Sequence, residues 1–182
     1  DLAVGLKTQS KGKIVTKVVS TVRGPFQSLY DCEGIECQVI DQDTQNIAAG
    51  WVSKLDYDSA IEKVQEFLQA ENPDIVISNT VYGFYAVLAA QRQGVPAIWI
   101  ISESFDQLEL KRSIDNFALE DCIRSFAQAY RVVFGSVGTR NRYESYNSKN
   151  NFQVIHNSVD QPAIDQFIND VSKEEARQRL GV

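Results

Sequence analysis

At 182 residues, the chain has the length of one domain and can bury a sizeable core. Its content of 43% hydrophobic and 23% charged residues is ordinary for a globular protein. The net charge of −6 argues against a general nucleic-acid binder, which would carry a basic stripe. No apolar run approaches the roughly 18 residues that a membrane-spanning helix needs. We therefore expect neither nucleic acid as a partner nor a membrane span.

The start of the sequence and its cysteines point to a cytoplasmic protein. Residue 1 is an aspartate, no methionine occurs, and no signal peptide precedes the first amphipathic pattern. We therefore expect an excised piece of a longer protein. Cys32, Cys37 and Cys122 are odd in number and lack the spacing of a metal site, which favours reduced thiols.

The first 40 residues predict a helix, a strand, a second helix and a second strand. Residues 2–9 suit a helix that is already under way, and the β-branched residues of 13–20 predict a short buried strand. Pro25 lies near the start of the next helix and Gly34 just past its end, which is the asymmetry that helices favour. Residues 35–40 predict the second strand.

A polar loop then runs through Trp51 to an amphipathic helix over residues 58–72. Asp58 or Ser59 would cap the amino-terminal end of this helix. Its apolar face consists of Ile61, Val64, Phe67 and Leu68.

The rest of the chain alternates between strands and helices with short connections. The predicted elements are a strand at 74–78, a helix over 80–94, a strand at 96–101, a long helix from about Gln107 to Tyr130, a strand at 131–134, a helix after Ser136 and a strand at 153–156. The strands at 74–78 and 96–101 are apolar without alternation, so helices should cover both of their faces. This order predicts a three-layer, Rossmann-like α/β domain with a parallel sheet.

Polar residues follow four of the predicted strands. In open α/β sheets, ligands bind beyond the carboxyl ends of the strands, so these residues should line one cleft. The candidates for substrate binding are Asn79, Thr80, Ser102, Glu103, Ser136, His156 and Asn157. The alternative for Thr80 and Ser136 is a purely structural role, in which they cap the helices that begin there.

Glu103 and His156 carry the most chemistry among these candidates. A carboxylate directly after a buried strand could hold a sugar hydroxyl or a ribose, but Glu103 could equally pair with Lys111 or Arg112 on the next helix. His156 could contact substrate, although a single histidine without an acidic partner is more often structural.

No complete catalytic constellation is present in the sequence. It lacks a G-x-G-x-x-G turn, a G-x-x-x-x-G-K-[ST] loop and a G-x-S-x-G elbow. It also lacks histidines and cysteines at metal-ligand spacing. We therefore expect no catalytic residue, no metal and no cofactor in this chain.

Several segments of the chain, taken in their order, match the pattern of a known family. The central stretch is "NPDIVISNTVYGFYAVLAAQRQGVPAIWIISESF", and "AYRVVFGSVGTRNRYESY" with "NFQVIHNSVD" follows it. These stretches resemble the amino-terminal half of GT-B glycosyltransferases, and more narrowly the large retaining family called family 4. "DLAVGLKTQ" resembles the first helix, and "RGPFQSLYDCEGIECQVID" the segment after it. "SKEEARQRLGV" resembles the helix ahead of the second domain.

The resemblance implies an architecture. Residues 1–160 would form the acceptor-side Rossmann-like domain, and 161–182 the start of the interdomain linker or crossing helix. The family's strand order, 3-2-1-4-5-6-7, places its first strand at the centre of the sheet. Since the strand ahead of residues 2–9 is absent from this sequence, we expect a gap beside the strand at 74–78.

The resemblance also implies a function for the parent protein, transfer of a sugar with retention to a saccharide or glycolipid acceptor in polysaccharide biosynthesis. The nucleotide-sugar donor would bind the parent's own carboxy-terminal domain, and the parent could contact a membrane peripherally. Three residues depart from the family pattern: Asn79 and Ser102 stand where histidines are frequent, and Ser158 replaces a glycine. The alternative is a non-catalytic α/β domain for ligand binding or regulation.

Overall fold

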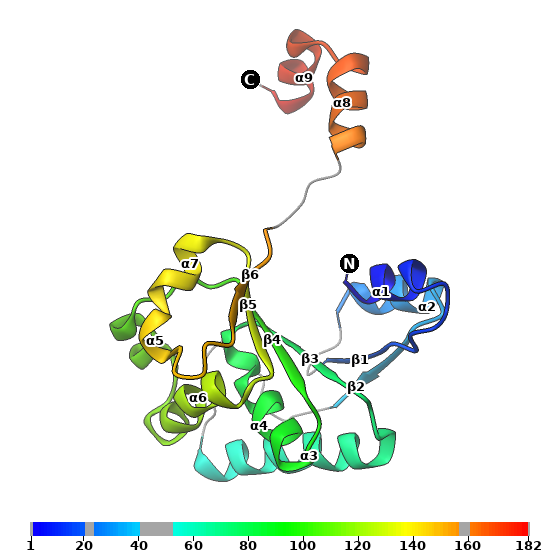
Figure 1. Cartoon of the computed structure of the whole chain (residues 1–182). Coiled ribbons are helices and arrows are strands. Elements are labelled where there is room, and N and C mark those ends of the chain that lie inside the picture. Colours follow the sequence, from blue (N-terminus) through cyan, green and yellow to red (C-terminus); the bar gives the residue numbers. More distant parts are fainter. Residues whose placement is uncertain (1, 21–23, 41–52, 157–160, 182) are drawn as a thin grey trace.

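The computed structural model describes residues 2–20, 24–40, 53–156 and 161–181 (Figure 1). The strands are β1 (Lys17–Ser20), β2 (Glu36–Val39), β3 (Val76–Asn79), β4 (Ala97–Ile101), β5 (Arg131–Phe134) and β6 (Phe152–Val154). The helices are α1 (Leu2–Gln9), α2 (Phe26–Cys32), α3 (Lys54–Glu71), α4 (Phe84–Arg92), α5 (Gln107–Ser113), α6 (Asn116–Gln128), α7 (Val137–Arg142), α8 (Gln161–Asp170) and α9 (Lys173–Leu180). Two short 3₁₀ helices are η2 (Val81–Gly83) and η3 (Glu144–Tyr146).

All six predicted strands are present, and every pair is parallel. The strands form two sheets, β1-β2 and β3-β4-β5-β6. Figure 1 shows α1 and α2 on one side of the strands and α3 and α4 on the other. The predicted α/β class with a parallel, Rossmann-like sheet is therefore confirmed. The predicted start of the first strand is wrong, because residues 13–16 are not extended in a sheet and β1 begins at Lys17.

The gap expected beside the third strand is present. Within the described residues, β1 pairs only with β2 and β3 only with β4. Between these two open edges lies a cavity of about 290 Å³ that Ser20 and Asn79 both line. Ile77 on β3 and Ile75 just before it are 37% and 44% exposed, so the prediction that both faces of this strand are covered is wrong.

The main core lies between one face of the four-stranded sheet and three helices. α4 packs against β3 and β4 and contacts both α3 and α6. Trp99 on β4 is fully buried and its ring centroid lies 4.7 Å from that of Phe126 on α6. Phe126 stacks in turn on Tyr146, with their centroids 5.1 Å apart. This aromatic cluster fixes the carboxyl half of the sheet against the helices.

Two predicted helices differ from those observed. The helix predicted over 58–72 begins four residues earlier, at Lys54, and Ser53 rather than Asp58 or Ser59 is its N-cap. The single helix predicted from Gln107 to Tyr130 is two helices, because Ile114 between α5 and α6 is extended and buried. A buried side chain here outweighs the helical preference of the surrounding residues.

Replacing the observed cap of α3 should weaken the fold. The Ser53 hydroxyl accepts a hydrogen bond from the Asp56 amide at 3.2 Å, which satisfies one of the free donors at the helix start. We expect Ser53→Ala to lower the free energy of unfolding by about 1 kcal/mol in urea denaturation. Ser59→Ala, inside the helix, is the matched control and should change it by less than about 0.5 kcal/mol. A larger loss for Ser59→Ala would contradict the assignment.

The last two helices carry exposed apolar side chains. Ile164, Phe167 and Ile168 of α8 are 40%, 53% and 65% exposed and follow helical spacing. Ser172 caps α9 by accepting from the Glu175 amide at 3.1 Å. The domain boundary near residue 160 stays a prediction. Among the residues that the structure describes, no helix is both long and apolar enough to cross a membrane.

Candidate functional site

The predicted site residues follow strands that run parallel in one sheet. β3, β4, β5 and β6 are hydrogen-bonded neighbours in that order, so their carboxyl ends form one edge. Asn79, Ser102, Ser136 and His156 follow, or end, these four strands and therefore belong to this edge. Asn157 lies outside the described residues. That all these side chains line a single cleft stays a prediction.

Glu103 contacts the backbone and not a neighbouring cation. Its Oε2 atom accepts hydrogen bonds from the Val81 amide at 3.0 Å and from the Ser102 amide at 3.2 Å. None of the ion pairs among the described residues involves Glu103, so the expected alternative of a pair with Lys111 or Arg112 is wrong. Glu103 thus ties the end of β4 to the turn that follows β3.

Thr80 does not cap the helix that follows it, which was the alternative expected for this residue. Its side chain makes no capping hydrogen bond, and its backbone has φ 70° and ψ 157°. This region is essentially restricted to glycine, and a β-branched residue there is strained. The Thr80 carbonyl accepts from the indole Nε1 of Trp99 at 2.7 Å and from the Gly83 amide at 3.1 Å.

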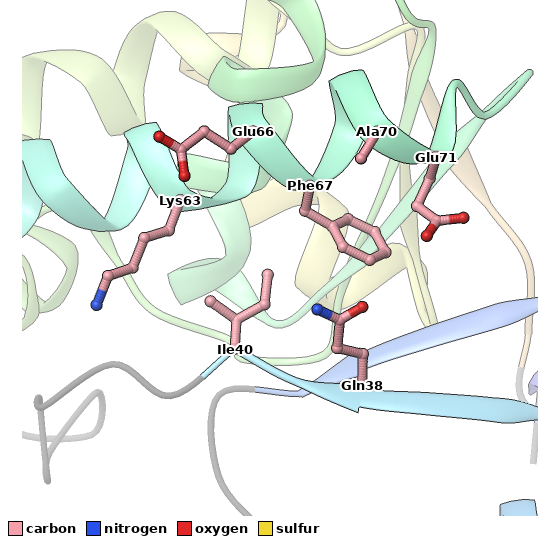
Figure 2. A pocket seen from close by; sticks show the side chains of 7 residues that line it. All are labelled: Gln38, Ile40, Lys63, Glu66, Phe67, Ala70 and Glu71. Carbon is pink, nitrogen blue, oxygen red and sulfur yellow. The ribbon is translucent and has the colours of Figure 1, made fainter.

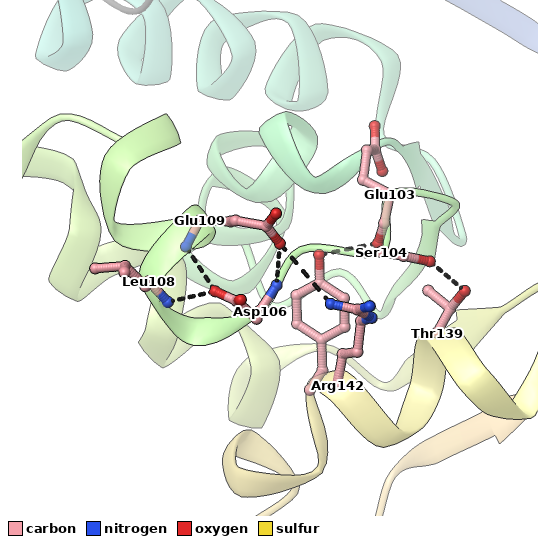
Figure 3. Close-up of polar contacts among 8 residues, drawn as sticks. Glu103, Ser104, Asp106, Leu108, Glu109, Thr139 and Arg142 are labelled. Carbon is pink, nitrogen blue, oxygen red and sulfur yellow. Dashed lines mark hydrogen bonds and ion pairs between the residues drawn. The ribbon is translucent and has the colours of Figure 1, made fainter.

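Ser136, in contrast, has the capping role that was the alternative to substrate binding. Its hydroxyl accepts from the Thr139 amide at 3.0 Å at the start of α7. The Thr139 hydroxyl lies 3.0 Å from that of Ser136 and 2.7 Å from that of Ser104, in the contact that Figure 3 shows. This chain of three hydroxyls joins the end of β4 to the end of β5 and holds the edge together.

The loop after Glu103 is fixed by a capping box. Asp106 accepts from the Leu108 and Glu109 amides at 2.8 Å each, and Glu109 accepts from the Asp106 amide at 2.7 Å (Figure 3). The backbone hydrogen bonds from Glu109 and then Leu108 hold the pKa of Asp106 below its ordinary value. Arg142 of α7 lies 3.9 Å from Glu109.

Tyr143 also holds the start of this loop in place. Its hydroxyl donates to the Glu103 carbonyl at 3.0 Å, and its ring is fully buried. Burial raises the pKa of the Tyr143 hydroxyl, so it remains a hydrogen-bond donor at neutral pH. The sequence pattern gave no signal for this contact, because the two residues lie on different elements.

Two cavities lie near the smaller sheet. The cavity between β1 and β3 touches the predicted edge, and its lining has no charged side chain: Val19, Ser20, Asn79, Thr80, Tyr82, Gly83 and Tyr85. The second, of about 400 Å³, lies between β2 and α3 (Figure 2). It is lined by Gln38, Ile40, Lys63, Glu66, Phe67, Ala70 and Glu71, none of which follows a strand of the larger sheet.

The described residues contain no metal site. They hold no group of three or more histidine, cysteine, aspartate or glutamate side chains that could bind an ion. His156 is exposed at the end of β6. The arrangement offers hydroxyl, amide and backbone groups for hydrogen bonding and one carboxylate that is already engaged.

The fold is that of the amino-terminal, Rossmann-like domain of GT-B proteins. Residues 46–161, more than half of the chain, match the family described as Glycosyltransferase Family 4. The chain therefore belongs to this family. None of the curated proteins matches the sequence significantly.

Solved structures with the same fold include UDP-N-acetylglucosamine 2-epimerases and MurG. A UDP-N-acetylglucosamine 2-epimerase from Rickettsia bellii is 16% identical with a TM-score of 0.59, and the match covers 100% of this chain and 47% of that one. A UDP-GlcNAc 2-epimerase from Neisseria meningitidis bound to UDP-GlcNAc is 18% identical with a TM-score of 0.58, covering 83% and 40%. MurG from Acinetobacter baumannii is 16% identical with a TM-score of 0.57, covering 89% and 42%. The chain thus spans less than half the length of these three proteins.

Proposed function

We propose that this chain is the acceptor-binding half of a retaining glycosyltransferase. The whole protein would transfer a sugar from a nucleotide-sugar to a saccharide or glycolipid acceptor, in the cytoplasm and as a step of polysaccharide biosynthesis. The observation that carries the proposal is the family match over residues 46–161, which includes β3 to β6 and their carboxyl ends. Peripheral contact with a membrane would bring a glycolipid acceptor to this edge.

The charge at the sheet edge favours an acceptor over a donor there. A nucleotide-sugar carries a diphosphate, which needs cationic groups or free helix amides where charge develops. On α7, Arg140 pairs with Glu144 at 3.0 Å and Arg142 lies 3.9 Å from Glu109, so both cations face carboxylates. The side chains of Asn79 and Ser102 are neutral and exposed, which suits the hydroxyl groups of a saccharide.

The donor would accordingly bind a carboxy-terminal domain of the same polypeptide. Transfer requires donor and acceptor to be held together, and one wall of a cleft cannot supply that positioning. The partners that we propose are therefore this second domain and the acceptor, with the nucleotide-sugar as the second substrate.

Calorimetric titration tests whether the donor binds outside residues 1–182. We expect residues 1–182 to show no binding of uridine or guanosine diphosphate sugars at micromolar to millimolar concentrations, and no sugar transfer. The full-length polypeptide that contains the chain should bind one of these donors and transfer its sugar with retention. Uridine diphosphate without a sugar is the control for binding of the nucleotide alone. Micromolar binding of a donor to residues 1–182 would contradict the proposal.

Epimerisation of a nucleotide-sugar is the second candidate. It is favoured by the structural match to 2-epimerases, one of them bound to UDP-GlcNAc. The same full-length polypeptide distinguishes the two activities. Epimerisation of UDP-GlcNAc needs no acceptor and its product still carries the sugar on the diphosphate, whereas transfer releases the nucleoside diphosphate. Absence of both activities would favour a non-catalytic binding or regulatory domain.

A further inference from the structure

Both polar groups of a single peptide unit, the one that joins Thr80 to Val81, are held by side chains of β4 and the loop after it. Trp99 donates from Nε1 to the Thr80 carbonyl at 2.7 Å. Glu103 accepts from the Val81 amide at 3.0 Å. Together with the Gly83 amide, which also donates to the Thr80 carbonyl at 3.1 Å, these two side chains fix the rotation of the peptide plane, which is the ψ angle of Thr80.

That rotation is one that Thr80 would not adopt by itself. With φ 70° and ψ 157°, the residue lies in a region that side chains with a Cβ atom disfavour and β-branched ones disfavour most. The conformation therefore depends on the groups that hold it.

The two side chains that hold this peptide differ in mobility. Trp99 is fully buried in the aromatic cluster and cannot move without disrupting the core. Glu103 is partly exposed, and in Figure 3 its side chain extends away from the Asp106 and Glu109 contacts. Its carboxylate oxygens have only acceptor capacity, which suits the two amide donors that converge on Oε2.

We propose that Glu103 is a positioning residue: it clamps the Thr80–Val81 peptide in its strained conformation and thereby holds in place the turn that follows Asn79 and Thr80 at the substrate edge. Asn79 and Thr80 both line the cavity beside β3, so the clamp sets the shape of its wall. The link to substrate rests on the proposed function. The clamp itself does not, since it is a property of the protein without any ligand.

Nuclear magnetic resonance on residues 1–182 tests the clamp. The chain has two tryptophans, so the Trp99 indole signal can be assigned with Trp51→Phe. In E103A the Thr80 backbone should relax and turn its carbonyl away, which moves the Trp99 indole proton upfield and speeds its hydrogen exchange at least tenfold. E103Q keeps an acceptor oxygen and should restore the signal to near its native position.

Thr80→Gly supplies the decisive comparison. Glycine adopts this conformation without strain, so nothing drives the peptide to turn when the carboxylate is lost. The double variant T80G/E103A should therefore keep the native indole signal that E103A alone loses. An unchanged signal in E103A, or a shifted signal in the double variant, would overturn the proposal. E120A, which removes an exposed glutamate of α6, is the control and should leave the indole signal unchanged.

If E103A does not fold, E103Q carries the test. A neutral amide oxygen is a weaker acceptor than a carboxylate, so the Val81 amide proton should move upfield and exchange several-fold faster. A Val81 amide that does not change would overturn the proposal. In the full-length polypeptide, E103A should raise the KM for acceptor but not for donor, and E103Q should raise it less. An unchanged acceptor KM with an altered indole signal would contradict the acceptor role and leave the clamp intact.

Discussion

Trp99→Ala should destabilise the protein by about 3–5 kcal/mol, the range for removing a large aromatic side chain from a packed core. Trp99 is fully buried against Phe126 and also donates to the Thr80 carbonyl, so the substitution leaves a cavity and removes one donor to the strained turn. Urea denaturation followed by circular dichroism measures the loss. This loss is a large share of the roughly 5–15 kcal/mol by which folded domains are ordinarily stable.

Two further variants separate the two contributions of Trp99. Trp99→Phe keeps most of the ring volume and removes the Nε1 donor, so its loss should be clearly smaller than that of the alanine variant. Phe26→Ala removes an aromatic ring that is 62% exposed and should cost less than about 1 kcal/mol. If Trp99→Ala proved as mild as Phe26→Ala, the aromatic cluster would not be the centre of the core.

Gly83→Ala should destabilise the protein by about 1–3 kcal/mol through overpacking. A Cβ atom at Gly83 would lie 2.2 Å from the Ser78 hydroxyl oxygen, and both residues are buried. The φ angle of Gly83 is −74°, so the expected loss is steric and owes nothing to backbone strain. The Ser78 hydroxyl would also lose its 2.8 Å hydrogen bond to the Gly83 carbonyl if it had to turn away. Thermal and urea denaturation measure the effect.

A second substitution at the same contact checks this mechanism. Ser78→Ala removes the clashing oxygen, and the remaining Ser78 carbon at 3.5 Å is at an ordinary distance. The double variant S78A/G83A should therefore be more stable than G83A, although S78A alone is destabilising. Gly138→Ala is the matched control, because its Cβ would meet the nearest atom only at 3.8 Å. Additive losses at positions 78 and 83 would rule out the steric explanation.

Local sequence patterns were sufficient for the strands and for most of the helices. The β-branched and aliphatic residues of β4 and β5 are largely buried in the structure. The positions of these two strands could be predicted from the composition of the two segments alone. The same holds for α2. Pro25 marks its start and Gly34, with a positive φ angle, lies just past its end, and both signals come from the backbone properties of these two residue types. Where a helix end lacks such residues, the sequence does not single out the cap. Ser53, Asp58 and Ser59 are all residue types that cap helices, and in the structure Ser53 caps α3.

For the candidate site, too, the sequence determined one part and the tertiary structure another. The sequence by itself determined that polar residues follow the strands, that these strands run parallel, and that the chain belongs to a glycosyltransferase family. Only the tertiary structure decided what Glu103 and Thr80 do. The Glu103 carboxylate accepts from the Val81 amide, 22 positions away, and the Thr80 carbonyl accepts from the Trp99 indole, 19 positions away. Hydrophobic periodicity reports which face of an element is buried. It carries no information on which buried donor meets which acceptor, since that depends on the packing of elements far apart in the chain.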